Sequence, residues 1–176
     1  DLARAVFRKA DLTAARMGHA NLREAVLDET DLCEAYLQGA SLARAHGSAT
    51  LLTDANLSRA DLSEARFPNA MASGVALHEA NLSKAEFPEA SLEGAWGLRV
   101  NAQGAALPKL RAAGANFAES DFRGVRAAGS IWQGAELFHV DFLGADLSGA
   151  EFEGANLTQA RLSGADLSNA RLVKAV

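Results

Sequence analysis

The chain has 176 residues, of which 49% are hydrophobic and 6% aromatic, with a net charge of −5 and a pI near 5.4. This length and hydrophobic content suit one ordinary domain with its own core and exclude a disordered chain. The acidic balance argues against a basic nucleic-acid groove, and no apolar run approaches the ~20 residues that cross a bilayer, so we expect a soluble, cytoplasmic protein without membrane or direct nucleic-acid contact.

An apolar residue recurs every five positions from Leu2 to Leu172, and we call these 35 residues the centres. Leu, Phe or Met occupies 28 of the centres, and Ala occupies 26 of the 35 positions 5, 10, 15 and so on to 175. A step of five residues fits neither the 3.6-residue turn of a helix nor the two-residue alternation of a strand. The pattern therefore predicts a solenoid that turns a corner every five residues, with the Ala and the centre of each unit inside.

The prolines indicate how many units make one coil. Pro68, Pro88 and Pro108 each follow a centre directly and are spaced by 20 residues. Four units per coil would stack them on one side of the solenoid. The prediction is then about nine coils of 20 residues, which at a stacking distance of ~4.8 Å make a rod of roughly 40 Å.

Seven centres are not Leu, Phe or Met: Gly47, Ala72, Gly97, Ala102, Ala112, Ala127 and Trp132. Small centres would leave cavities, which cost stability. An enlarged inward neighbour or a large centre one coil away is expected to restore the volume. The expected pairs include Thr50 with Gly47, Val75 with Ala72, and Phe117 with Gly97. We therefore interpret the irregular middle as repacked solenoid and predict one domain over 1–176. Because the sequence opens on Asp1, we expect that this domain can be part of a longer protein.

The frequency of glycine at the corners changes along the chain. Of the 12 glycines that stand two places after a centre, only Gly39 precedes residue 70. Because glycine adopts positive φ without a steric cost, the sequence predicts more type II corners in the C-terminal half than in the N-terminal half.

The units ADLSG, ANLTQ, ADLSN, ANLSR and ADLSE match a known motif, A(D/N)LXX. Over its whole length the chain resembles the pentapeptide repeat family. The resemblance implies an all-β fold, a right-handed quadrilateral β-helix with the Ala and the central Leu or Phe inside.

Catalytic interpretations find little support. The four histidines, His19, His46, His78 and His139, belong to different coils, so none pairs with another around one metal. Cys33 lies outside next to Glu34, and an acidic neighbour raises a thiol pKa. The glycines recur at the solenoid period and form no phosphate loop. We predict no enzyme, no catalytic residue, no metal site and no cofactor.

Two groups of outward residues are candidates for recognition. The side centred on Leu12, Leu32 and Leu52 carries seven acids and three bases. Its acidic stripe is Asp11, Asp31, Glu34, Asp54 and Glu93. The candidate partner surface is Tyr36, Leu51, Met71, Trp96, Leu98 and Phe138, of which Trp96 with Leu98 is the best pair.

These observations favour a non-catalytic scaffold for protein–protein interaction, presented on a rigid rod. The alternative comes from the resemblance, because some pentapeptide repeat proteins mimic DNA and bind type II topoisomerases such as gyrase. Duplex DNA carries on the order of 25 charges over the length of this rod, against a net charge of 5 here, so only a single stripe could imitate one strand. The coil ends, with unpaired backbone edges, also allow end-to-end self-association. Solubility alone would explain the acidic stripe equally well.

Overall fold

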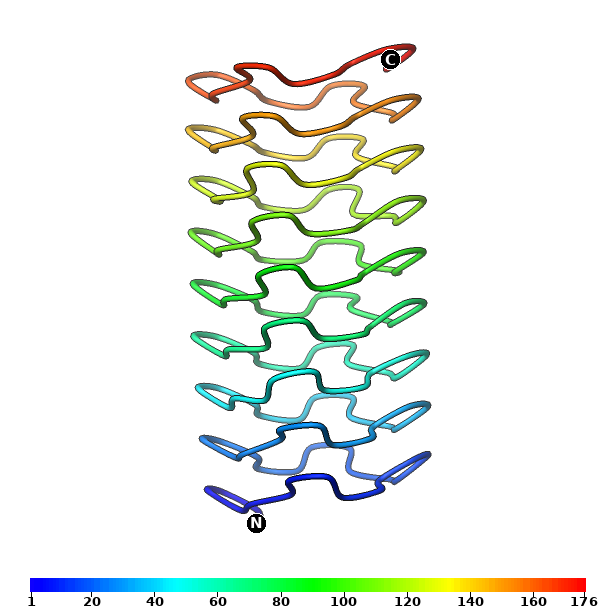
Figure 1. Ribbon diagram of the computed structural model, residues 1–176, viewed down its shortest axis with the longest axis vertical. Helices are drawn as coiled ribbons and strands as arrows, with labels where there is room; N and C mark the ends of the chain where they lie inside the picture. Colours follow the sequence, from blue (N-terminus) through cyan, green and yellow to red (C-terminus); the bar gives the residue numbers. More distant parts are fainter.

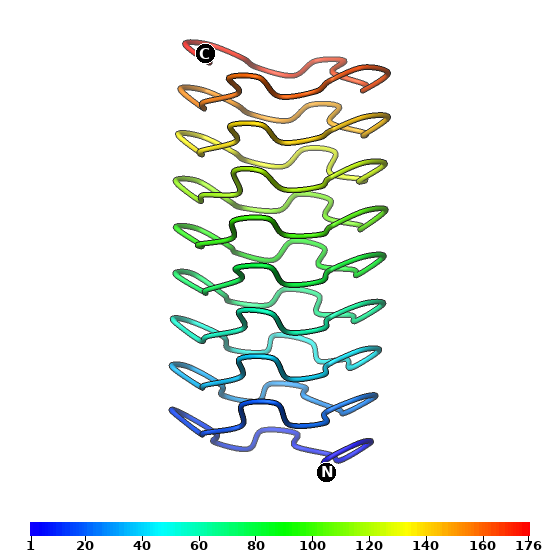
Figure 2. The same ribbon diagram turned by 180° about the vertical axis from the view of Figure 1, so that it is seen from behind.

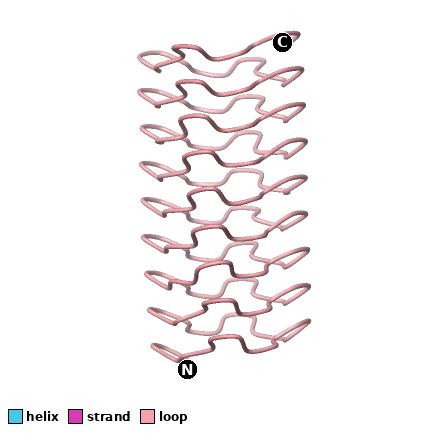
Figure 3. Ribbon diagram, viewed as in Figure 1, coloured by secondary structure: helices cyan, strands magenta, loops and turns pink.

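The computed structural model describes residues 1–176 as one stack of four-sided coils, with the two termini at opposite ends (Figures 1 and 2). It contains no helix and no continuous strand, and the whole chain is drawn as loop and turn (Figure 3). Instead, one residue of each pentapeptide forms a parallel β-bridge with the residue 20 positions later, from Val6–Val26 to Glu151–Arg171. One coil is therefore four pentapeptides, as the proline spacing predicts, and the expected β-helix is confirmed.

A short nomenclature describes every residue of the rod. Within each pentapeptide we number the residues 1 to 5, with the centre at position 2. Position 1 forms the bridge and points outward, positions 3 and 4 form the turn, and position 5 points inward. The four faces are named I to IV after their first centres, Leu2, Phe7, Leu12 and Met17. The corner that follows each face carries its positions 3 and 4.

Backbone hydrogen bonds join each coil to the next. The N–H groups at positions 2 and 4 donate to carbonyl groups one coil later, as from Leu2 to Asn21 at 2.8 Å. The N–H at position 1 donates to the previous coil, as from Val26 to Ala5 at 2.9 Å, and the N–H at position 5 usually closes the turn onto its own centre. Only the N–H at position 3 has no backbone acceptor anywhere in the rod.

The free N–H at position 3 explains two features of the sequence. An Asp or Asn at position 1 accepts this N–H with its side chain, as Asp61 does from Ser63 at 3.0 Å. This local bond is the physical reason for Asp or Asn at the second letter of the repeat motif. Proline has no N–H to lose, so Pro68, Pro88 and Pro108 all occupy position 3 without breaking a hydrogen bond.

The turns are alike from one end of the rod to the other. All 35 residues at position 4 have positive φ, between 51° at Ala49 and 69° at Gly74, and 23 of them are not glycine. Together with the hydrogen bond from position 5 to the centre, a positive φ at position 4 alone is the pattern of a type II turn. The predicted enrichment of such turns in the C-terminal half is therefore wrong. The stacked hydrogen bonds require the same turn in every coil, and they override the ~1–2 kcal/mol that a side chain costs there.

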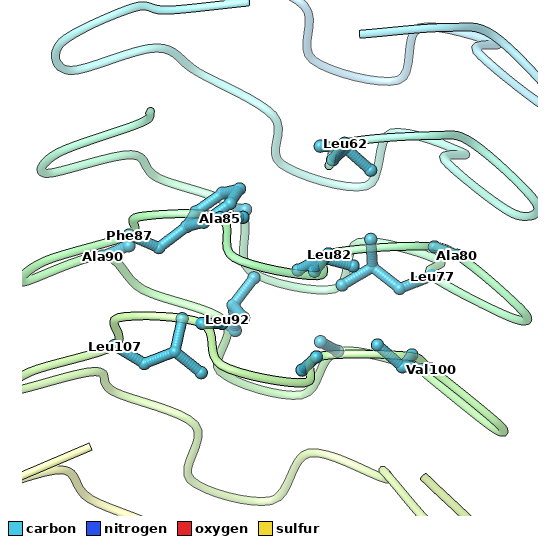
Figure 4. Close-up of a cluster of buried hydrophobic side chains, with 14 of the residues drawn as sticks. Leu62, Leu77, Ala80, Leu82, Ala85, Phe87, Ala90, Leu92, Val100 and Leu107 are labelled. Atoms are coloured by element: carbon cyan, nitrogen blue, oxygen red, sulfur yellow. The ribbon is translucent and has the colours of Figure 1, made fainter. Parts of the chain in front are cut away.

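The core is a continuous column of inward side chains. Every residue at positions 2 and 5 is buried from Leu22 to Ala155, as the repeat predicts. Figure 4 shows part of this column, where Leu62 and Leu82 project inward from neighbouring coils. Toward the two ends the inward residues are only partly covered, as Leu2 and Leu167 are.

Two of the three predicted compensations at small centres are confirmed. A Cβ atom added to Gly47 would lie 2.4 Å from Oγ1 of Thr50. This hydroxyl also donates to the Leu27 carbonyl at 2.9 Å, so it remains satisfied inside the core. A Cβ atom added to Gly97 would lie 2.6 Å from the ring of Phe117. Both glycines are thus required by the neighbours that fill their space.

The third compensation is incomplete. An apolar void of about 10 Å³ remains at the level of Ala72, lined by nine hydrophobic residues that include Val75 and Phe87. The valine adds two methyl groups next to a missing leucine side chain, and this does not fill the whole volume. The volume at Ala72 is therefore restored only approximately, as predicted.

Trp132 is the largest side chain of the core and carries a polar atom. Its ring lies 5.7 to 6.3 Å from the rings of Phe122, Phe142 and Phe152. Its indole Nε1 donates to Oγ of Ser130 at 2.6 Å, and that hydroxyl donates to the Ala127 carbonyl at 2.6 Å. Serine at this inward position is therefore explained by the tryptophan beside it.

Candidate protein-interaction surface

Charged side chains on three corners of the rod form ion pairs that run from coil to coil. In many of these pairs the partners occupy position 4 in neighbouring coils, and on the corner after face I the acids and bases alternate from Arg4 to Lys84. Each pair is exposed and contributes little to stability by itself, but together the pairs neutralise these corners. Examples from the corners after faces I, II and IV are Arg44–Glu64 at 3.0 Å, Lys109–Glu89 at 3.0 Å and Arg59–Glu79 at 2.9 Å.

The corner after face III has no such alternation. Glu34 and Asp54 occupy position 4 in neighbouring coils, and glycine takes over from Gly74 to Gly154. On face III itself, Asp11 and Asp31 are bridge partners, so two more acids are stacked. None of these four carboxylates is in an ion pair, whereas most acids of the neighbouring coils are. Like charges stacked in this way repel, so this arrangement lowers stability where the other corners raise it.

The structure separates Glu93 from the rest of the predicted acidic stripe. Glu93 accepts a hydrogen bond from Nε of Arg111 at 2.8 Å and is neutralised by it. We call the remaining four residues, Asp11, Asp31, Glu34 and Asp54, the acidic cluster. Thr13 donates its hydroxyl to Asp11 at 2.7 Å and its N–H at 3.0 Å, and these two bonds hold the pKa of Asp11 below its usual value. The Asp11 carboxylate is therefore charged at neutral pH.

The six apolar residues predicted to form a partner surface all point outward, but they differ in exposure. Trp96 is 59% exposed, Met71 49% and Tyr36 44%. The other three are half-buried: Leu51, Leu98 and Phe138.

These apolar residues do not form one patch. Leu51 and Met71 are bridge partners on face III, next to the acidic cluster. Tyr36 and Trp96 belong to the same row of face IV, three coils apart. The small residues Asn56 and Ala76 lie between them in that row. The remaining two, Leu98 and Phe138, lie on the corner after face IV.

Faces III and IV meet at one corner, which we call the III–IV edge. There Glu34 and Tyr36 line the same shallow hollow, together with Ala14 and Arg16. The acidic cluster and the exposed apolar residues therefore approach each other at this edge. Sequence reasoning missed Arg16, because it was assigned to face IV while its acidic neighbours were assigned to face III. The sequence did hold a signal for Arg16, because it follows by two residues Ala14, which lies in the same corner row as Glu34.

Little in the structure points to reaction chemistry. No three His, Cys, Asp or Glu side chains are arranged to hold a metal ion. Cys33 is half-buried, and burial first and the Asp31 carboxylate second raise the pKa of its thiol. The sequence predicted this direction but named Glu34 as the acidic neighbour. No helix in the structure is long and apolar enough to span a membrane.

Comparisons with known proteins match the repeat. The family described as pentapeptide repeats matches in eight copies, over residues 1–39, 31–69, 61–96, 115–159 and 135–173. The unmatched segment 97–114 holds the small centres Gly97, Ala102 and Ala112, yet its coils continue without interruption. No curated protein matches the chain.

Solved structures resemble the rod along nearly all of its length. HetL from the cyanobacterium Nostoc sp. strain PCC 7120, a pentapeptide repeat protein involved in heterocyst differentiation regulation, is 29% identical, with a TM-score of 0.50. That comparison covers 98% of this chain and 84% of HetL. A trypsin-treated variant of QnrB1, a plasmid-mediated fluoroquinolone resistance protein, is 20% identical with a TM-score of 0.57, and 94% of this chain and 88% of that one are covered. The five-residue register, the 20-residue coil and the family match together establish that this chain belongs to the pentapeptide repeat family.

Proposed function

We propose that this chain is a non-catalytic scaffold that binds another protein along the III–IV edge. The observation that carries the proposal is the coincidence of the acidic cluster with the exposed apolar residues of faces III and IV. Everywhere else in these coils most acids are paired, so the cluster is a local departure that costs stability. A surface arrangement that lowers stability is typical of a functional site rather than of a structural element.

The composition of the surface supports the same proposal. Tyrosine, tryptophan and methionine are enriched in protein interfaces, and Tyr36, Trp96 and Met71 are the exposed residues here. The hydrogen-bonded stack also holds these side chains on a backbone that is the same in every coil. A partner would therefore meet a preorganised surface, which lowers the entropic cost of binding.

Site-specific photocrosslinking in cells of the source organism tests this proposal. A photoreactive residue is introduced at Met71 on face III, or at Ala106 on face II as the control position. Discrete adducts from position 71 and none from position 106 support the scaffold. Equal adducts from both positions, or none from either, contradict a partner surface at the III–IV edge.

A second candidate function is local DNA mimicry toward a type II topoisomerase such as gyrase. The observation that favours it is charge density. The acidic cluster spans three successive coils, or ~10 Å, which amounts to roughly one charge per 3 Å. One strand of duplex DNA carries one charge per ~3.4 Å of axis, so the cluster is comparable to a short stretch of a single strand. The likeness to QnrB1 supports the fold only.

Titration of the purified protein into a gyrase supercoiling assay tests the second candidate. The acidic cluster is neutralised by Asp11→Asn, Asp31→Asn, Glu34→Gln and Asp54→Asn. A control variant removes the same amount of charge elsewhere, by Glu119→Gln, Glu136→Gln, Glu151→Gln and Glu153→Gln. Inhibition by the parent and the control, but not by the cluster variant, supports mimicry. No inhibition well above micromolar concentrations rejects it and leaves the scaffold.

A further inference from the structure

Trp96 stands at one end of an unobstructed path along the III–IV edge. Its side chain is the most exposed aromatic group of the rod. It follows Gly94 by two residues, and the position below it in the same row of face IV is Ala76. A Cβ atom built on Gly94 would meet nothing within 4 Å. The tryptophan ring therefore has open space beside it on the edge.

The carboxylates of Glu34 and Asp54 stand at the other end of this path. One coil beyond Asp54 lies Gly74, where an added Cβ atom would be 2.2 Å from Oδ1 of Asp54. The Asp54 carboxylate thus extends over Gly74, toward Trp96, into space that only glycine leaves free. From Glu34 to Gly94 the path covers three coil steps, or ~14 Å.

The charged surroundings of the path leave its carboxylates uncompensated. Arg16 lines the hollow at Glu34 but lies farther than 4 Å from any carboxylate oxygen. On the far side of face IV, Glu79 pairs with both Arg59 and Arg99, at 2.9 and 3.6 Å. The path is therefore acidic from Glu34 to Gly74, where the Asp54 carboxylate extends, and aromatic at Gly94 and Trp96.

We infer that this path binds an extended segment of a partner protein in which a lysine or arginine stands four residues from a large apolar residue. Four residues of extended chain span ~13 Å, which matches the ~14 Å of the three coil steps from Glu34 to Gly94. A guanidinium group can bind the stacked carboxylates of Glu34 and Asp54 with charge-assisted hydrogen bonds. The apolar residue packs on Trp96 against Gly94. This inference rests on the proposed scaffold function and specifies the chemistry of its partner.

Fluorescence anisotropy with a labelled synthetic peptide tests the inference. The probe is the blocked peptide Arg-Arg-Thr-Val-Thr-Leu-Leu. The control peptide Arg-Arg-Leu-Leu-Thr-Thr-Val has the same composition but no apolar residue four places from an arginine. We expect the parent protein to prefer the probe and its affinity to fall as salt is raised. Comparable affinity for both peptides, or no anisotropy change at millimolar protein, overturns the inference.

Three variants locate the binding. Glu34→Gln with Asp54→Asn, and separately Trp96→Ala, are expected to weaken binding of the probe roughly five- to tenfold. The matched control, Glu119→Gln with Glu151→Gln, removes two unpaired acids elsewhere and is expected to leave the affinity within about twofold. Equal weakening by the control shows a diffuse charge effect and overturns the inference. All the changed side chains point outward, and thermal unfolding of each variant checks that it is folded.

The two proposals fail separately. Adducts at position 71 without binding of the probe retain the scaffold and overturn the proposed peptide chemistry. Binding of the probe without adducts supports the peptide chemistry and contradicts a cellular partner at this edge.

Discussion

Ala128 occupies the next place in the row of prolines, 20 residues after Pro108, and we expect Ala128→Pro to stabilise the rod. Its N–H belongs to position 3 and has no hydrogen-bond acceptor. Its carbonyl accepts the N–H of Lys109 at 2.9 Å, just as the Pro68 carbonyl accepts that of Ala49 at 2.9 Å, and proline keeps this acceptor. The new residue would precede Gly129, whose φ is +64°. Proline followed by a residue with positive φ is the preferred sequence of a type II turn.

The expected magnitude follows from the unfolded chain. A proline that fits the native backbone stabilises a protein by about 0.4–1 kcal/mol, because it restricts the unfolded state. For a chain of this length 1 kcal/mol raises Tm by roughly 2–4 °C. Differential scanning calorimetry of the parent and the variant at matched concentration measures this shift.

A matched control on the same face distinguishes turn geometry from a general effect of proline. Ala49 is at position 4, with φ 51°, and donates its N–H to Pro68. Ala49→Pro removes this hydrogen bond and imposes a negative φ, so it should destabilise by well over 1 kcal/mol. If Ala128→Pro lowers Tm as much as Ala49→Pro does, the assignment of positions 3 and 4 to a type II turn is refuted.

Three further predictions concern the turns, the core and the acidic cluster. Gly94→Ala meets no atom but acquires a side chain at φ +64°, and urea unfolding should show a loss of about 1 kcal/mol; an unchanged midpoint would contradict the steric account of the turn. Ser130→Ala leaves the buried indole N–H of Trp132 without its acceptor and should cost about 1–3 kcal/mol in the same assay, with an unaltered stability arguing against that bond. NMR should show that the Asp11 carboxylate titrates below its usual pKa, and Thr13→Val should raise that pKa. A carboxylate whose pKa is lower in the folded state stabilises the fold at pH values above its unfolded pKa, and this stabilisation is lost as pH falls through the folded pKa. Identical titrations in both proteins would refute the role of Thr13.

The candidate site was only partly predictable. Charge and side assignment identified the acidic residues and the exposed aromatics, because outward positions follow directly from the five-residue register. They did not reveal that Glu93 is neutralised by Arg111. That pairing depends on where long side chains reach between coils, and the repeat does not specify it. That Glu34 and Asp54 lack ion-pair partners is evident only in the structure, where most acids on the other corners are paired with bases.

The sequence by itself determined the register and the identity of every inward residue, because one small and one large apolar side chain in every five can be buried together only if the chain turns after each pentapeptide. The 20-residue spacing of the prolines indicated the four-sided coil. Only the tertiary structure decided the turns. Arg4 and Gly104 adopt φ of 60° and 67°, although arginine and glycine differ in their intrinsic preference for positive φ. The reason is that the N–H at position 4 must donate to the next coil while the N–H at position 5 closes the turn. Local preference predicts a difference between these residues, and the hydrogen-bonded stack removes it.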